Sequence, residues 1–212
     1  EEKNSLKFIG MEYLKQIGQL NPPYLFWSSL GLYVIIFFRY LILSWVYHLF
    51  FHRWLRDKFR NRLLSISKLR SRQIRREISS SAISAAIFTM LGMGVIILWQ
   101  QGHTAIYTNF DVYPVWYSLL SVCLVLIIQD TFYYWLHRWM HIPPFYRWIH
   151  KEHHMSLQTS AFTSFSFHPL ESLLQAIVLP VLVLWLPLHI GVILAILLIM
   201  TLAATINHGA VE

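Results

Sequence analysis

Charged side chains are scarce in this sequence. Of the 212 residues only 13% are Asp, Glu, Lys or Arg, whereas 56% are hydrophobic, and soluble domains usually carry about 25% charged residues. This shortage excludes an ordinary soluble domain. Nine Trp, eleven Tyr and fourteen Phe suit the aromatic belts that form where a protein crosses the surface of a bilayer. The composition therefore indicates an integral membrane protein.

Cysteine is almost absent, and no cleavable signal peptide is evident. Cys123 is the single cysteine and stands in an apolar segment, so a disulfide framework is excluded. The first twenty residues are mixed and polar, without the apolar core of a signal peptide. We expect residues 1–21 to form an amphipathic lead-in on the membrane surface.

Long apolar runs predict an all-α, polytopic fold with about four to five transmembrane or re-entrant helices. Three runs are long enough to span a bilayer, and two shorter runs separated near Pro187 either span it or re-enter; the third run is expected to continue as a helix through His141. We divide the chain into a membrane region at 1–113 and a histidine-rich domain at 114–212. The five runs are Tyr24–Phe51, Ser79–Trp99, Pro114–Trp135, Leu173–Leu188 and Ile190–Ile206.

Basic residues gather between the first two spans. Residues 52–78 hold ten of the seventeen Lys and Arg, with apolar residues at helical spacing, which predicts a basic amphipathic helix on an anionic membrane surface. Nucleic-acid binding is the weaker interpretation of the +7 net charge, because spans on both sides tether this segment to lipid. Residues 100–113 contain no Lys or Arg. The positive-inside rule then places 52–78 in the cytoplasm and 100–113 outside.

Five of the eleven histidines fall between His137 and His154. His137 and His141 share one helical face, as do His150, His153 and His154 on the next segment. Two such faces, joined by a short link that contains two prolines, could close on one or two metal ions, and neutral imidazole suits iron, zinc, copper and nickel. The alternative is a set of histidines that only line the edge of the membrane.

The predicted membrane topology places the remaining histidines on one side of the bilayer or the other. Three spans bring residues 137–168 to the cytoplasmic face, and the last apolar pair returns His208 to that side. His48 and His52 lie at the same end and are candidates for contact with the ligands. His103 and His189 fall on the opposite face or deep in the bilayer, and we discount them.

Two acids are further candidates. Asp130 precedes His137 on the same helical face and could fix an imidazole tautomer by accepting its N–H; a pairing with Arg39 or Arg138 is equally favoured. Glu171 could orient His168 or supply an oxygen ligand, or it could simply be an acid in the first turn of a helix. Lys151 and Glu152 are expected to point outward.

The motifs taken together resemble the sterol desaturase and fatty acid hydroxylase superfamily. A His-x3-His box is matched by His137 and His141, and a His-x2-His-His box by His150, His153 and His154. The segments HPLE, at His168, and NHGAVE, at His208, look like two further family features. The resemblance covers residues 129–212.

The resemblance implies a membrane-bound di-iron oxygenase, an oxidoreductase with monooxygenase-type chemistry that hydroxylates or desaturates a sterol or fatty-acyl lipid. Electrons would come from cytochrome b5 or a ferredoxin with its reductase. The active site would face the cytoplasm, from the endoplasmic reticulum of a eukaryote or the inner membrane of a bacterium. The implied iron ligands are His137, His141, His150, His153, His154 and His208, with His168, Asp130 and Glu171 as additional ligands or supporting residues.

The chain departs from the family pattern in one respect. The family's last His-x2-His-His box does not occur before Glu212. Either the domain continues beyond that residue, which is the interpretation we favour, or the protein binds fewer metals and is not active as it stands. The competing hypotheses are a non-catalytic or hydrolytic zinc site, which lacks the His-Glu-x-x-His helix of zinc proteases, and a transporter or scaffold, which would scatter its histidines through the spans.

Overall fold

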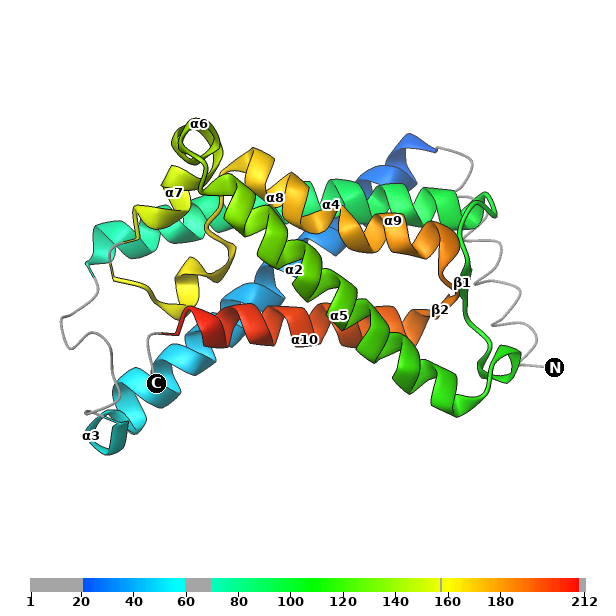
Figure 1. Cartoon of the computed structure of the whole chain (residues 1–212), viewed down its shortest axis with the longest axis horizontal. Helices are drawn as coiled ribbons and strands as arrows, with labels where there is room; N and C mark the ends of the chain where they lie inside the picture. The colour runs from blue at the N-terminus through cyan, green and yellow to red at the C-terminus, as the bar shows by residue number, and fades with distance from the viewer. Residues whose placement is uncertain (1–20, 60–69, 157, 210–212) are drawn as a thin grey trace.

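The computed structural model describes residues 21–59, 70–156 and 158–209, and in these ranges the chain is almost entirely helical (Figure 1). The predicted lead-in at 1–21 falls almost wholly outside them. The elements in chain order are α2 (Pro22–Leu49), the π-helical η1 (Phe50–Trp54), α3 (Arg56–Phe59), α4 (Ser71–Gln100), β1 (Ile106–Tyr107), the 3-10 helix η3 (Phe110–Val112), α5 (Val115–Met140), α6 (Pro143–Phe145), the π-helical η4 (Tyr146–His150), α7 (Lys151–His154), the 3-10 helix η5 (Ala161–Phe165), α8 (Pro169–Ala176), α9 (Val178–Trp185), β2 (Leu188–His189) and α10 (Ile190–Asn207).

Four helical segments are long and apolar enough to cross a membrane. They are α2 with η1, α4, α5 and α10, whereas α8 and α9 make a shorter apolar segment, Pro169–Trp185. The all-α, polytopic prediction is therefore confirmed. The third span ends where expected, since α5 continues to Met140 and His141 is its C-cap.

Proline and glycine set the helix ends. Prolines open α2, α6 and α8 at their first positions, where the missing N–H costs nothing and the fixed φ suits a helix. Helix α4 ends at Gln100, and two residues later Gly102 has a φ of 77°, while the amides of Gly102 and His103 donate to the carbonyls of Trp99 and Leu98. This is a Schellman motif, and its left-handed residue favours glycine.

The helix contacts use small and hydroxylated residues. Ser81, Ser84 and Ala85 of α4 are buried, as expected for spans that pack closely in a membrane. Outward positions carry large apolar side chains, including Val115 at 85% exposure and Trp185 at 82%. In a bilayer these side chains face lipid, while small and polar residues such as Ser81, Ser84 and Ala85 share the interior with a core of larger apolar side chains.

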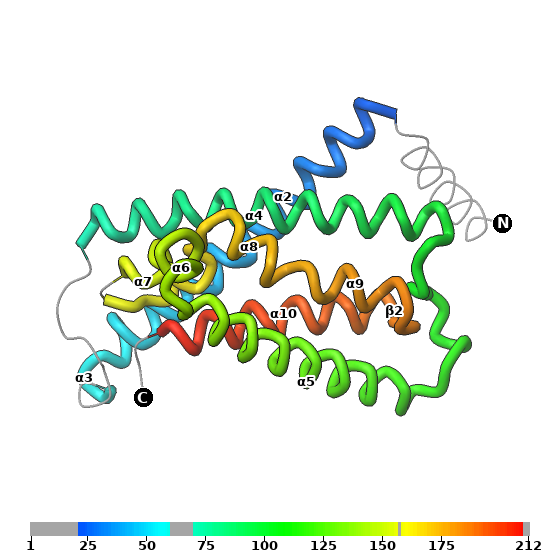
Figure 2. The backbone as a smooth tube through the Cα atoms, turned by 45° about the horizontal axis from the view of Figure 1, so that its top comes forward, coloured from blue at the N-terminus to red at the C-terminus, as the bar shows by residue number. Residues whose placement is uncertain are grey.

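The two ends of the helix bundle differ. One end collects the carboxyl end of α5, α6, α7, the first turns of α4 and the last turn of α10, and α3 lies at the same end (Figures 1 and 2). At the other end β1 pairs in parallel with β2, joining Ile106 to Leu188 and Tyr107 to His189. The sequence did not predict this short pairing. The histidine-rich segment and the basic segment therefore share one end.

The predicted single amphipathic helix over 52–78 is not observed. The described part of this segment is divided: η1 extends the first span to Trp54, α3 forms one turn, and residues 71–78 are the first two turns of α4. Leu55 leaves the helical conformation at φ −107° and ψ 15°. Residues 60–69 lie outside the described ranges.

Candidate metal centre

His137 and His141 come from the last turn of α5 and its C-cap. They are four residues apart, and their Nε2 atoms lie 3.1 Å apart. The i, i+4 spacing stacks both imidazoles on one side of the helix, at the point where Pro143 and Pro144 turn the chain into α6.

His150 and His154 join this pair from a second segment. A π-helical turn, η4, leads into α7, and the Nε2 atoms of His150 and His154 lie 3.0 Å apart. One ring nitrogen from each of His137, His141, His150 and His154 lies within 4.8 Å of the others. Four imidazole nitrogens so close together could hold one metal ion, and we call this group the four-histidine position.

A buried carboxylate orients His150. Both side chains are fully buried, with His150 Nδ1 2.9 Å from Glu171 Oε1, so that the Nδ1–H donates and Nε2 turns toward the other three histidines. Gln175 Nε2 donates to the same oxygen at 3.0 Å. Burial raises the pKa of Glu171 to about 9, whereas a cation bound at the histidines would favour its ionised form.

His153 does not join the four-histidine position. Its Nε2 lies 3.2 Å from Nε2 of His208, at the end of α10. Its Nδ1–H donates to the Ser166 carbonyl at 3.2 Å, and His208 Nδ1–H donates to the Ala204 carbonyl at 2.8 Å. Both Nε2 atoms are thereby left as acceptors that face each other, and we call this pair the two-histidine position.

The clustered histidines that lie outside the spans have lowered pKa values. Burial and then the charge of His208 lower the pKa of His153 to about 3. Burial also lowers the pKa of His150 and of His208, and burial with neighbouring imidazoles lowers those of His141 and His154. The imidazoles are therefore neutral near pH 7, which is the form that binds metal.

Glu171 lies in the first turn of α8, which is one of the alternatives that the sequence offered, and His168 is the N-cap of the same helix. Glu171 contacts His150 and not His168. His168 caps α8, where its Nδ1 accepts the Leu170 amide at 3.3 Å, and its ring does not contact the other histidines that the structure describes. Among the described residues, therefore, His168 is a helix cap.

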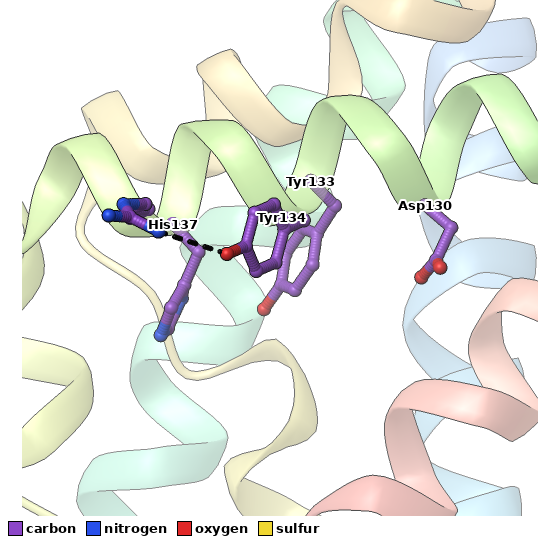
Figure 3. Close-up of a pocket in the computed structure, with 5 residues that line it drawn as sticks. Asp130, Tyr133, Tyr134 and His137 are labelled. Atoms are coloured by element: carbon purple, nitrogen blue, oxygen red, sulfur yellow. Dashed lines mark hydrogen bonds between the residues drawn. The ribbon is translucent and has the colours of Figure 1, made fainter.

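Asp130 lies away from the imidazoles. It is exposed and lies seven residues before His137, about 10 Å along the helix axis. Asp130, Tyr133, Tyr134, His137 and Arg138 line an open cavity of about 420 Å³ on α5 (Figure 3). Arg138 donates to the Tyr134 hydroxyl at 3.1 Å, and in the described part of the chain no ion pair joins Asp130 to Arg39 or Arg138.

Two other expectations about side chains are settled by the contacts. Glu152 does not point outward, because Ser80 Oγ of α4 donates to its Oε1 at 2.9 Å. His48 and His52 stack on each other with ring centroids 5.1 Å apart, and His48 lies against Phe162 rather than against the clustered histidines. The contact between His153 and the Ser166 carbonyl could not be predicted from the sequence, because every residue has a backbone carbonyl.

The set of donors fits a transition metal. Six neutral imidazoles present ring nitrogens in two groups, and the outer nitrogens of His150, His153 and His208 are held by a carboxylate or by carbonyls. Such outer contacts are typical of histidines that bind metal. Imidazole ligands suit iron, zinc, copper and nickel.

Comparisons with known proteins point to one group of enzymes. Residues 122–211 match the fatty acid hydroxylase family. The chain is 29% identical over 119 residues to the Delta(7)-sterol 5(6)-desaturase ERG3B of Gibberella zeae, covering 56% of this chain and 37% of the relative. It is 26% identical over 152 residues to the lathosterol oxidase of Homo sapiens, covering 71% and 47%. A third relative, the desaturase ERG3A of Gibberella zeae, is 25% identical over 181 residues, covering 82% and 50%.

The chain thus spans half or less of the length of these relatives. No solved structure matches it.

Proposed function

We propose that this chain, whose residues 122–211 belong to the sterol desaturase and fatty acid hydroxylase superfamily, is the metal-binding part of a membrane-bound di-iron oxygenase that hydroxylates or desaturates a lipid. The observation that carries the proposal is the gathering of six imidazoles into two positions at one end of a bundle of apolar helices. Bound iron would supply the activation of O2 that an unreactive C–H bond requires.

Each position would hold one iron. His137, His141, His150 and His154 would bind the first, and His153 and His208 would contribute to the second. Glu171 and the Ser166 carbonyl hold the Nδ1–H groups of His150 and His153. These contacts fix the tautomer that offers Nε2 and so prepare the site before metal enters.

The open cavity on α5 supports entry of a lipid from the bilayer. It begins at His137 and lies on a helix whose outer face is apolar and exposed. A lipid could reach the metal positions without leaving the membrane. We propose a sterol or fatty-acyl lipid, and the similarity to sterol desaturases and to lathosterol oxidase favours the sterol class.

Orientation and electron supply complete the proposal. Arg53, Arg56 and Lys58 lie at the same end as the histidines, and the positive-inside rule favours a cytoplasmic site. Electrons would come from cytochrome b5 or a ferredoxin with its reductase. The membrane would be the endoplasmic reticulum of a eukaryote or the inner membrane of a bacterium, with residues 1–113 as the membrane region and 114–212 as the oxygenase domain.

The test is iron content together with oxygen-dependent turnover of sterols by the purified protein in lipid nanodiscs. We expect about two irons per full-length chain and O2-dependent loss of hydrogen from, or oxygen insertion into, a lipid. A protein that binds no iron after reconstitution, or that keeps its activity with zinc in place of iron, would refute the proposal.

A further inference from the structure

Glu77 is a fully buried carboxylate in a span outside the family match. It lies in the second turn of α4 at 0% exposure, 45 residues before residue 122, where the match begins. Burial of an acid is costly unless hydrogen bonds satisfy it, so its partners show what the residue holds in place.

Three side chains donate to Glu77. Gln73 Nε2 donates to Oε1 at 2.8 Å and Thr163 Oγ1 to the same oxygen at 3.1 Å, while Ser160 Oγ donates to Oε2 at 3.2 Å. Ser160 is the N-cap of η5 and its side chain forms a capping box with Thr163. Glu77 therefore binds both ends of that capping box and fixes the start of η5 against α4.

The same short helix is held from its other side by the first span. Tyr40 Oη donates to the Phe162 carbonyl at 2.7 Å, and Ser44 Oγ donates to the Ala161 carbonyl at 2.9 Å. The next residue after η5 is Ser166, whose carbonyl accepts the Nδ1–H of His153. The loop from Ser160 to Ser166 is thus held by two spans, α2 and α4, and it in turn positions the imidazole of His153.

Helix α4 also contacts the residues that precede and follow His153 in the chain. Ser80, one turn after Glu77, donates to Glu152, the residue before His153, and Arg76 Nη2 lies 3.4 Å from Ser156 Oγ, three residues after it. The polar side chains of α4 therefore contact the chain on both sides of His153.

We propose that Glu77 is a positioning residue for the two-histidine position. By fixing the loop from Ser160 to Ser166 it holds the carbonyl that keeps His153 in the tautomer with Nε2 free toward His208. This rests on the proposed function, since it takes the two-histidine position as a metal site. Glu77 is not itself a ligand, because both of its oxygens accept hydrogen bonds from α4 and the loop.

The experiment measures the affinity of each metal position with Co2+ in the intact protein, by chelator competition followed by visible absorption. Thr163→Val removes the hydroxyl that meets Glu77 and keeps the side-chain volume. Outer contacts of this kind are worth about 10- to 100-fold in metal affinity. We expect a loss in that range at the two-histidine position and no change at the four-histidine position.

Glu77→Gln provides a second measurement that keeps the size and the acceptor oxygen for Gln73 and Thr163, while its amide N–H can donate to the Ser160 hydroxyl. It should restore most of the affinity that Glu77→Ala loses. Thr89→Val is the matched control: Thr89 is buried on the same helix and donates to the Ala85 carbonyl at 2.8 Å, within α4. Its variant should lower the thermal midpoint as much as Thr163→Val while leaving both affinities unchanged.

The outcomes separate the two proposals. Equal Co2+ affinity at both positions in wild type and in Thr163→Val would overturn the role of Glu77 while leaving the proposed function intact. An equal loss in Thr89→Val would also overturn it, because the effect would then follow stability alone. A wild-type protein that binds no metal would overturn both.

Discussion

Removing the carboxylate behind His150 gives the most direct test of the four-histidine position. Glu171 Oε1 is 2.9 Å from His150 Nδ1, and both side chains are fully buried, so water cannot replace a lost partner. We compare Glu171→Gln, which keeps an acceptor oxygen but removes the charge, with Glu171→Leu, which removes the acceptor.

The magnitude follows from the two kinds of hydrogen bond. A bond to a charged group contributes about 1.5–3 kcal/mol and a neutral one about 0.5–1.5 kcal/mol, so Glu171→Gln should lose about 1–1.5 kcal/mol of metal-binding energy. That is about tenfold in affinity, since each 1.4 kcal/mol is about a factor of ten. Glu171→Leu leaves the Nδ1–H unpaired and should lose about 100-fold.

The assay is chelator competition with Co2+ on purified protein, followed by iron content after reconstitution. His168→Ala is the control, because His168 caps the same helix, α8, without contacting the clustered histidines. It should leave metal affinity unchanged and lower stability by about 1 kcal/mol. If Glu171→Leu binds metal as tightly as wild type, His150 does not depend on Glu171 and the assignment of the four-histidine position is refuted.

Three further predictions concern the histidines and their surroundings. His153→Ala should abolish metal binding at the two-histidine position and lipid oxidation while leaving membrane insertion intact; full activity in a lipid oxidation assay would show that His153 is not a ligand. Gly209→Ala should weaken that position and lower stability by about 1–3 kcal/mol, because an added Cβ would meet the Tyr47 ring beside His208; metal affinity equal to wild type would contradict this. The third prediction concerns pH. In the folded protein the pKa values of these histidines lie below the ordinary value of about 6.5, so the imidazoles stay neutral when the pH falls to 6.5. In the unfolded chain the same imidazoles take up protons at that pH. Metal should therefore be retained down to pH values below 6.5, and stability should begin to fall as pH drops past that point; a metal-release midpoint above 6.5, measured by dialysis at graded pH, would contradict the cause assigned to these shifts.

The spans and the local histidine pairs were predictable from sequence because both depend on short-range periodicity. Apolar runs long enough to cross a bilayer, bounded by Pro22 and Pro114, specify helices before any packing is known. The spacing of His137 to His141 and of His150 to His154 places each pair on one helical face. The shared location of the basic segment and the histidines at one end also follows from counting spans.

Only the tertiary structure decided how the histidines are divided. The box at 150–154 reads as one unit in sequence, yet consecutive helical residues point about 100° apart, so His153 and His154 cannot face the same place. His154 turns toward α5 and His153 toward His208, a residue 55 positions later. That pairing depends on where α10 packs, which no local pattern encodes.

The partners of the two buried acids, Glu171 and Glu77, could not be predicted from the sequence either. Glu171 stands near His168 in sequence, but the turn at His168 points it to His150, 21 residues earlier. Glu77 carries no motif and is separated from Ser160 and Thr163 by more than eighty residues. The sequence by itself determined that this chain crosses a membrane and gathers imidazoles at one end. The packing of α4, α8 and α10 decided which imidazoles meet and which acids hold them, because a contact between distant segments depends on the positions of whole helices rather than on the spacing within one.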